Sequence, residues 1–175
     1  IVVAAVTTAI VLTSGRYSRT EGRIAIGAIL PLTGQSAFLG QEERKGLEAA
    51  KALLLKHGVK VDIRYEDSMN AAKEGLSAFQ KLANLHDVDG IIVTHSGVNG
   101  PISEYIASQR NTQDQVPLVI GTIVASTKIT RNNDVFLRCY PSGEDEARAV
   151  AQYVIRDLKL TTIAVLYQND DYGLD

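Results

Sequence analysis

Short apolar runs and longer amphipathic runs alternate along this chain from residue 23 onward. Apolar runs cover residues 24–30, 90–94, 116–121, 135–137 and 162–167, and residues 59–65 alternate apolar with charged positions. Between these runs, residues 40–57, 70–83, 100–108 and 142–158 carry apolar side chains at helical spacing. Strands that alternate with helices are typical of βαβ units around a parallel sheet. The pattern predicts an α/β fold with a doubly wound sheet.

Three local patterns sharpen this prediction. The alternation over 59–65 predicts a half-buried strand near an edge of the sheet. The strand at 90–94 leads into a polar loop at 94–99 and then into a helix, with Gly100 at its cap and Pro101 at its first position. Ser142, followed three residues later by Asp145, predicts a capped helix start. The helix that follows carries the most regular apolar stripe in the chain, comprising Ala147, Val150, Ala151, Val154 and Leu158.

The first 22 residues differ from the rest of the chain. Residues 1–13 are apolar or threonine and carry no charge, and Arg16, Arg19 and Arg23 follow. This run suits the hydrophobic region of a secretory signal better than a membrane span, which needs roughly 20 residues. We therefore expect residues 1–22 to be a signal peptide, with an uncleaved membrane anchor or a β-strand as the alternatives.

Composition narrows the class of protein. The chain is 45% hydrophobic and 22% charged with a formal net charge of −2, which is ordinary for a soluble globular protein. The basic residues are scattered, so we expect no nucleic acid partner. Cys139 is the single cysteine and has no cysteine or histidine at metal-binding spacing, which predicts no internal disulfide and no metal site. We expect Cys139 to be buried, as free cysteines usually are.

The motifs of common α/β enzymes are absent from the sequence. The first strand leads into Pro31-Leu32-Thr33-Gly34 and not into a glycine-rich phosphate turn, and no zinc-protease motif or nucleophile elbow occurs. Glu66 and Asp67 follow the second strand and are interpreted as a turn or a helix cap. His95 and Ser96 are neighbours whose side chains are expected to point apart. We therefore predict a protein that is not an enzyme and has no cofactor; an enzyme that depends on His95 or Glu66 is the remaining alternative.

Hydroxyl groups collect where the predicted strands end, and this is where open α/β sheets bind ligands. Ser96 stands out, because its hydroxyl and the amides of Gly97 and the following residues would lie at the positive end of a helix and suit a carboxylate. The alternative for Ser96 and Thr122 is a purely structural role in their loops, and Tyr172 could be an uninvolved surface aromatic. The candidate ligand-binding residues are Thr33, Ser36, Ser96, Gly97, Thr122 and Tyr172.

Several segments in order resemble the type I periplasmic binding proteins, in particular the branched-chain amino acid receptors of ABC transporters. The segments that carry the resemblance are Ile29-Leu30-Pro31-Leu32-Thr33-Gly34, the strand and loop around Ser96, Val116-Pro117-Leu118, Phe136-Leu137-Arg138-Cys139-Tyr140-Pro141, and Val165-Leu166-Tyr167 with Asp171-Tyr172-Gly173. The resemblance spans residues 24–173.

The resemblance implies two α/β lobes that close on a ligand, with the second lobe incomplete in this chain. Residues 23–140 would form the first lobe and residues 141–175 the start of the second. In this family the loops at Ser96–Gly97 and Thr122 bind the ligand's carboxylate and amino groups, and the tyrosine matching Tyr172 contacts the ligand from the second lobe. One difference concerns the ligand: relatives often have a second small polar residue after Thr122, whereas this chain has Ile123 and Val124.

These expectations combine into one function. The chain is expected to belong to a periplasmic or extracellular solute-binding protein that captures an amino acid or similar small carboxylate for an ABC transporter permease. It would meet a membrane only through its N-terminal segment. The alternative is the ligand-sensing domain of a membrane-anchored receptor or regulator.

Overall fold

A computed structural model describes residues 22–85, 88–109, 116–130, 134–167, 169, 172 and 173. The predicted signal segment lies outside these residues except for Gly22, and so does the polar turn expected at 111–115. No helix in the described ranges combines the length and the apolar character that a membrane crossing requires.

A parallel five-stranded sheet forms the centre of the fold, with the strand order β2-β1-β3-β4-β5. The strands are β1 (Arg23–Leu30), β2 (Lys60–Asp67), β3 (Gly90–Thr94), β4 (Leu118–Thr122) and β5 (Phe136–Arg138). All four neighbouring pairs run parallel. Strand β2 lies at one edge, as its alternating sequence predicts. The predicted α/β class with a parallel sheet is confirmed.

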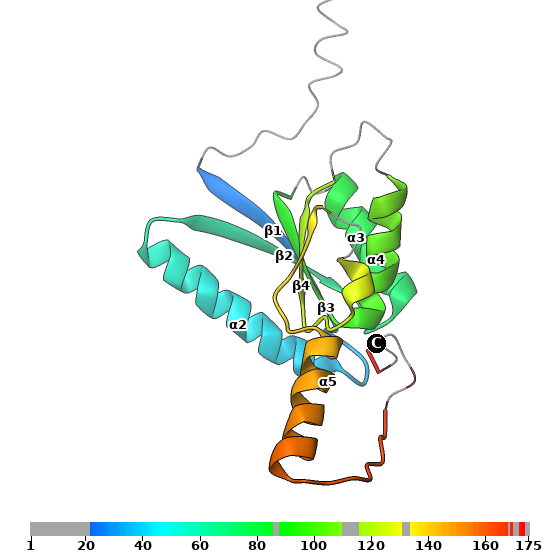
Figure 1. Ribbon diagram of the computed structural model, residues 1–175. Helices are drawn as coiled ribbons and strands as arrows, with labels where there is room; N and C mark the ends of the chain where they lie inside the picture. Colours follow the sequence, from blue (N-terminus) through cyan, green and yellow to red (C-terminus); the bar gives the residue numbers. More distant parts are fainter. Residues whose placement is uncertain are drawn as a thin grey trace, which may run out of the picture.

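Helices cover both faces of this sheet. Helix α2 (Ala37–Lys56) lies on one face, and helices α3 (Ala72–Leu85) and α4 (Ser96–Ser108) lie on the other (Figure 1). The chain adds β2 on one side of β1 and β3 on the other side, so the winding direction reverses between β1 and β3. This is the doubly wound arrangement that the sequence predicts.

The main hydrophobic core fills the layer between the sheet and helices α3 and α4. Strands contribute alternate residues to it, because successive side chains in a strand point to opposite faces; Ile91 and Val93 of β3 are buried in this way. Phe79 of α3 is fully buried and meets the ring of Tyr105 edge-on, with centroids 6.0 Å apart and an interplanar angle of 72°. The core fixes α3 and α4 against the strands, and thereby fixes the start of α4.

Cys139 is exposed, so its predicted burial is wrong. Phe136 of β5 points into the core, and Leu137 points away from it and is exposed. Cys139 is two residues after Leu137 and is therefore on the exposed side by the same alternation. An apolar neighbourhood in sequence does not decide which face of a strand a residue occupies.

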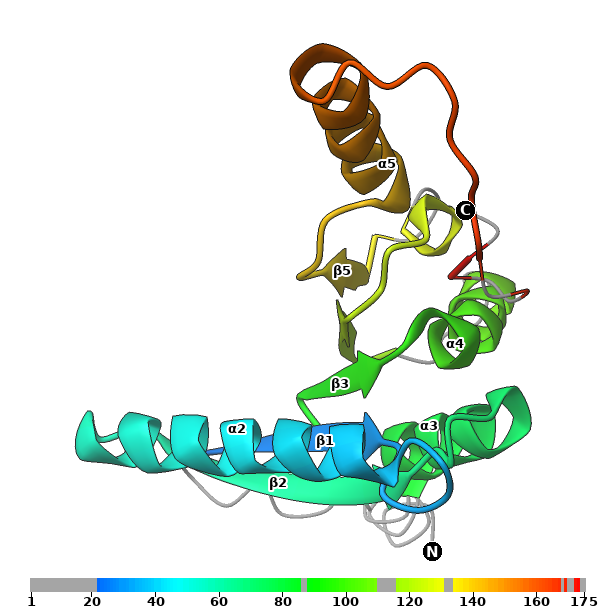
Figure 2. The same cartoon turned by 90° about the horizontal axis from the view of Figure 1, so that it is seen from below.

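The last described part of the chain stands away from the sheet (Figure 2). Helix α5 (Gly143–Gln152) begins at Ser142, whose hydroxyl accepts a hydrogen bond of 3.0 Å from the amide of Asp145, as predicted. It continues into a π-helical turn, Tyr153–Asp157. No residue of α5 is buried, and Val150 of its apolar stripe is exposed. Of the stripe, Val154 is partly buried and the other four residues are exposed.

The strand predicted at 162–167 is absent from the structure. This segment has no regular secondary structure, and Val165 and Leu166 are 80% and 100% exposed. A strand requires hydrogen bonds to a neighbouring strand, and no described residue pairs with this segment. Residues 162–167 are apolar as the sequence analysis says, but the prediction that they form a strand is wrong.

Candidate functional site

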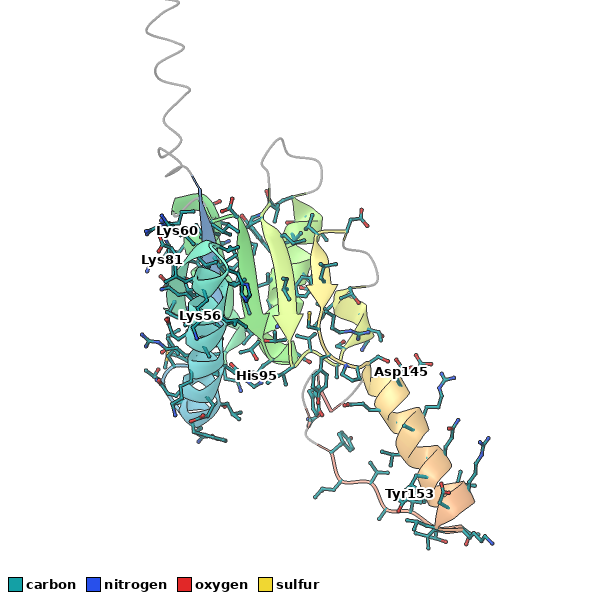
Figure 3. All side chains as sticks on the ribbon, turned by 90° about the vertical axis from the view of Figure 1, so that its left-hand side faces the viewer. Lys56, Lys60, Lys81, His95, Asp145 and Tyr153 are labelled. Carbon is teal, nitrogen blue, oxygen red and sulfur yellow. The ribbon has the colours of Figure 1, made fainter. Side chains whose placement is uncertain are left out.

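The carboxyl ends of β1 and β3 form the reversal point of the sheet, where ligands bind in open α/β folds. Their loops lead to helices on opposite faces of the sheet, so the loops diverge. Figure 3 labels His95 at this end of the sheet, beside α2. Five of the six predicted ligand-binding residues lie on the loops or strand ends at this edge; the exception is Tyr172.

Helix α4 begins at Ser96, so the predicted start at Gly100 and Pro101 is wrong. His95 is the capping residue, and its carbonyl oxygen accepts the amides of Val98 at 3.2 Å and Asn99 at 3.1 Å. The side-chain amide of Asn99 donates to the same oxygen at 2.8 Å. These bonds start the helix five residues before Pro101, which therefore lies inside α4, where it cannot donate the backbone hydrogen bond to the residue four positions earlier.

This earlier start changes which backbone groups are available. Ser96 and Gly97 are the first two residues of the helix, so their N–H groups have no acceptor within it. Ser96 is 2% exposed, and its buried hydroxyl has no hydrogen-bond partner among the described residues. A Cβ added at Gly97 would meet no atom within 4 Å, so the space beside its backbone is open. Two amides and one hydroxyl at a helix start can hold a carboxylate.

Thr122 lies next to this helix start. It pairs with Thr94 in the sheet register, and its carbonyl oxygen accepts the amide of His95 at 3.2 Å. The next residue, Ile123, has a φ of +52°, which turns the chain sharply after β4, and Val124 is fully buried. The structure therefore brings Thr122 and Ser96 together.

Thr33 is held by the end of β2. Its hydroxyl donates to Asp67 at 2.5 Å, and the amide of Leu32 donates to the same carboxylate at 2.8 Å. Ser36 accepts a hydrogen bond of 3.2 Å from the side-chain amide of Asn70. Thr33 and Ser36 can thus offer a ligand their remaining hydrogen-bonding capacity, from a loop that is fixed to the 67–70 turn.

Glu66 and Asp67 are the last two residues of β2, so placing them in a turn or helix cap after the strand is wrong. Asp67 does accept the amide of Met69 at 2.8 Å, but it also fixes the loop that holds Thr33. Burial raises the pKa of Asp67, and the bonds from the Thr33 hydroxyl and the amides of Met69, Leu32 and Thr33 together outweigh burial, so its pKa is lowered. The charged carboxylate is therefore favoured in the folded protein.

We expect Asp67→Asn to destabilise the protein in a pH-dependent way. Because folding lowers the pKa of Asp67, its stabilising contribution is present above the unfolded pKa, for which the reference value is 3.8, and is lost as the pH falls through the folded pKa. Urea unfolding of both proteins between about pH 3 and 7 should show a stability difference at neutral pH that shrinks at acid pH. Asp62→Asn, at an exposed ion pair with Arg23, is the control; an equal loss in both variants would contradict this role.

Tyr172 lies beside the segment that leads into α5. The Glu146 carboxylate, burial and the Tyr172 phenol raise the pKa of Tyr140, and Tyr140 forms side-chain hydrogen bonds with Glu146 and Tyr172. Tyr172 is exposed. The structure therefore brings Tyr172 to Tyr140 and Glu146, a pairing that the sequence did not predict because these residues are far apart along the chain.

Two further polar residues lie behind Ser96; from the sequence, His95 was considered only as a catalytic residue and Glu43 was not identified. Glu43 of α2 accepts the Thr94 hydroxyl at 2.9 Å, and its Oε1 atom lies 3.8 Å from His95 Nε2. Both side chains are largely buried, at 18% and 17% exposure. His95 has a φ of +66°, an unfavourable value for a side-chain-bearing residue. Helix α2 contains several glutamates, and its sequence does not indicate which of them points toward the sheet.

The arrangement offers binding groups and no acid–base pair at the Ser96 hydroxyl. That hydroxyl has no hydrogen-bond partner, so it is not paired with the His95 imidazole. Among the described residues there is no group of three or more His, Cys, Asp or Glu side chains that would hold a metal ion. The groups that the structure brings together at this edge are hydrogen-bond donors and acceptors.

Comparison with known proteins agrees with this architecture. The family model described as periplasmic binding protein matches residues 23–175. The chain is 30% identical over 168 residues to Leu/Ile/Val-binding protein homolog 3 of Brucella melitensis, an alignment that covers 92% of this chain and 44% of the relative.

Solved structures share the fold at low sequence identity. A leucine-binding protein from Thermotoga maritima matches with a TM-score of 0.73 and 18% identity over 86% of this chain and 42% of its own. An ABC transporter solute-binding protein from R. palustris, in complex with 4-hydroxybenzoate, matches with a TM-score of 0.70 and 16% identity over 87% of this chain and 40% of its own. The chain spans less than half the length of these relatives, and the match of the family model to residues 23–175 shows that it belongs to the periplasmic binding protein family.

Proposed function

We propose that this chain forms the first lobe, and the start of the second, of a non-enzymatic solute-binding protein that captures a small carboxylate. The observation that carries the proposal is the start of α4, where the amides of Ser96 and Gly97 and the buried, unpaired Ser96 hydroxyl meet at the reversal point of the sheet. Residues 23–140 form the first lobe and residues 141–175 begin the second. Helix α5 lies away from the sheet, and this position supports the division into two lobes (Figure 2).

The ligand's carboxylate binds at Ser96 and Gly97, and Thr122 adds a hydroxyl from the neighbouring strand end. Thr33 and Ser36 line the other side of the reversal point, from the loop fixed by Asp67 and Asn70. Tyr172 approaches from the second lobe. Its hydrogen bond with Tyr140 supports a position beside the segment that joins the lobes.

An amino acid and an aromatic acid both fit this proposal, because both present a carboxylate. The Leu/Ile/Val-binding relative supports the amino acid. The relative solved with 4-hydroxybenzoate, together with apolar Ile123 and Val124 after Thr122, supports an aromatic acid. The carboxylate is the common element, and it meets the same Ser96 site in both cases.

The protein works outside the cytoplasm and delivers its ligand to an ABC transporter permease. Family membership supports the periplasmic or extracellular location. Residues 1–22 act as a signal peptide in this proposal; if they are retained as an anchor, the protein is a membrane-anchored sensor of the same ligand. Mass spectrometry of the mature N-terminus distinguishes these cases, since a chain that keeps residues 1–13 supports the sensor.

We expect Ser96→Ala to weaken ligand binding by about 1–3 kcal/mol, because the ligand loses a buried hydroxyl that has no partner among the described residues. Isothermal titration calorimetry of the natural protein that carries this chain would use L-leucine, L-isoleucine, L-valine and 4-hydroxybenzoate as probes. Ser108→Ala is the matched control, since this serine is exposed at the other end of α4 and should leave the affinity unchanged.

Two results would count against the proposed function. Binding of a probe with equal affinity to the wild type and to Ser96→Ala would place the carboxylate elsewhere. The absence of binding by amino acids and by small aromatic or aliphatic acids alike would contradict the carboxylate as the recognised group.

A further inference from the structure

A buried pair of titratable side chains lies directly behind the proposed carboxylate site. Glu43 projects from α2 toward the end of β3, where the Thr94 hydroxyl donates to its Oε1 atom at 2.9 Å. The Nε2 atom of His95 lies 3.8 Å from the same oxygen. His95 is the residue immediately before Ser96 and caps the helix whose first amides form the site.

Both side chains leave polar atoms unsatisfied. The Oε2 atom of Glu43 and the Nε2 atom of His95 are buried, and neither has a hydrogen-bond partner in the described part of the chain. An unsatisfied buried polar atom is costly, and natural proteins usually pair such atoms or place them where they serve a function. Two of them, on groups that face each other across 3.8 Å, indicate a place that accepts a proton.

No other charged group compensates this pair in the described part of the chain. On α2, the neighbouring charges are Glu42, Arg44 and Lys45; Lys45 pairs with Glu42, and Arg44 stacks over the ring of Tyr65. From β3, the neutral Thr94 hydroxyl contacts the Glu43 carboxylate. The Thr122 carbonyl and the Asn99 amide are also neutral, and they bind the backbone N–H and C=O of His95. Glu43 and His95 are therefore the only titratable groups that the described contacts place at this position.

The separation of the pair suits a weak ion pair, but burial opposes charge on both partners. Burial raises the pKa of Glu43, partly offset by the Thr94 hydrogen bond, and burial lowers the pKa of His95. Each group alone favours its neutral form. A proton added to the pair leaves it with no net charge, whichever of the two side chains holds it.

We propose that Glu43 and His95 form a coupled proton-binding pair whose charge controls the affinity of the adjoining Ser96 site for a carboxylate. The proton comes from the solvent and forms an O–H or an N–H bond, with no other chemistry. When the pair has lost its proton, the Glu43 carboxylate repels an anionic ligand at Ser96; when the proton is bound, this repulsion disappears. Ligand binding then takes up a proton. The ligand-dependent part rests on the function proposed above.

A first experiment tests the pair without any ligand. The three histidines of the chain are followed by NMR as a function of pH, and the signal of His95 is identified by its loss in His95→Gln. Glu43→Gln removes the charge, keeps the side-chain shape and can still accept the Thr94 hydroxyl. Because the negative carboxylate favours the charged imidazole, Glu43→Gln should lower the His95 midpoint by about half a pH unit or more.

Two further variants serve as a control and as a substitute in this experiment. Glu42→Gln makes the same change one position earlier, on an exposed side chain, and should leave the His95 midpoint unchanged. If Glu43→Gln does not fold, Thr94→Val removes the hydrogen bond that favours the charged carboxylate and should lower the His95 midpoint in the same direction. An unchanged His95 midpoint in the folded variant overturns the inference, whether or not any ligand binds.

A second experiment tests the link to the ligand. Calorimetry uses L-leucine and 4-hydroxybenzoate between about pH 6 and 8, in phosphate and in Tris, and the difference between the heats in the two buffers measures proton uptake. In this range 4-hydroxybenzoate is an anion and L-leucine is a zwitterion without net charge, so the affinity of 4-hydroxybenzoate decides the test. Wild-type affinity should fall as the pH rises, by up to about ten-fold per pH unit, and Glu43→Gln should abolish this dependence. Binding without proton uptake overturns the control of affinity. If no probe binds, the proposed function fails for these ligands, and the histidine titration still decides whether the pair exists.

Discussion

Replacing Gly40 by alanine is expected to lower the free energy of unfolding by about 3 kcal/mol, the upper end of the usual cost of overpacking. A Cβ at this position would lie 2.1 Å from the carbonyl oxygen of Pro31 and 2.6 Å from its carbonyl carbon. The obstacle is backbone, which cannot rotate away as a side chain can. Helix α2 must therefore move away from the end of β1. Urea unfolding followed by circular dichroism measures the change.

The same helix supplies the control for this prediction. Gly46 lies in α2, and a Cβ there would meet no atom within 4 Å. Gly46→Ala should stabilise the protein by about 0.5–1 kcal/mol, because alanine loses less conformational freedom in a helix than glycine does. If the two substitutions had the same effect, the close approach of α2 to Pro31 would be wrong.

The Gly40 contact also has a functional consequence. Residues 31–36 carry Thr33 and Ser36, and they lie between the end of β1 and the first turn of α2. Displacing α2 displaces Glu43 as well, which lies one helical turn after Gly40. A folded Gly40→Ala protein should therefore bind its ligand more weakly, even though Gly40 itself has no side chain to offer.

Phe79→Ala is the second substitution with a large expected effect, a loss of about 3–5 kcal/mol in the free energy of unfolding. Phe79 is 0% exposed and occupies the centre of the layer between the sheet and helices α3 and α4. Its removal leaves a cavity and also deprives Tyr105 of its edge-on aromatic contact. Thermal or urea unfolding would measure the loss.

Phe38→Ala provides a matched control, because it removes the same side chain from a position that is 67% exposed. Its effect should stay within about 0.5 kcal/mol. A similar destabilisation by both substitutions would show that the core does not lie where the structure places it.

Most strands and helices were predictable because their signals are local. Residues 90–94 form the predicted strand, and Ser142 caps its helix through Asp145 as expected. The alternation over 59–65 also predicted the edge position of β2. In each case the deciding property, apolar periodicity or a capping side chain, is contained in a few neighbouring residues.

The candidate site was predictable only in outline. Its position at strand ends follows from the parallel sheet, and Ser96 follows from its place after β3. The start of α4 was predicted wrongly because proline is typical of the first position of a helix. The hydrogen bonds that begin α4 instead involve the His95 carbonyl and the Asn99 side chain. Element boundaries depend on such contacts, which a propensity pattern does not contain.

The sequence by itself determined the class of fold, the order of its elements and the edge of the sheet at which polar groups collect, because periodicity and strand-to-helix alternation are properties of neighbouring residues. Only the tertiary structure decided that Glu43 and His95 face each other, that Asp67 holds the Thr33 loop, and that the apolar segment at 162–167 pairs with no described strand. These facts depend on contacts between residues distant in the chain. Burial and hydrogen bonding across such contacts set which polar groups are satisfied, and therefore which remain available for a ligand or a proton.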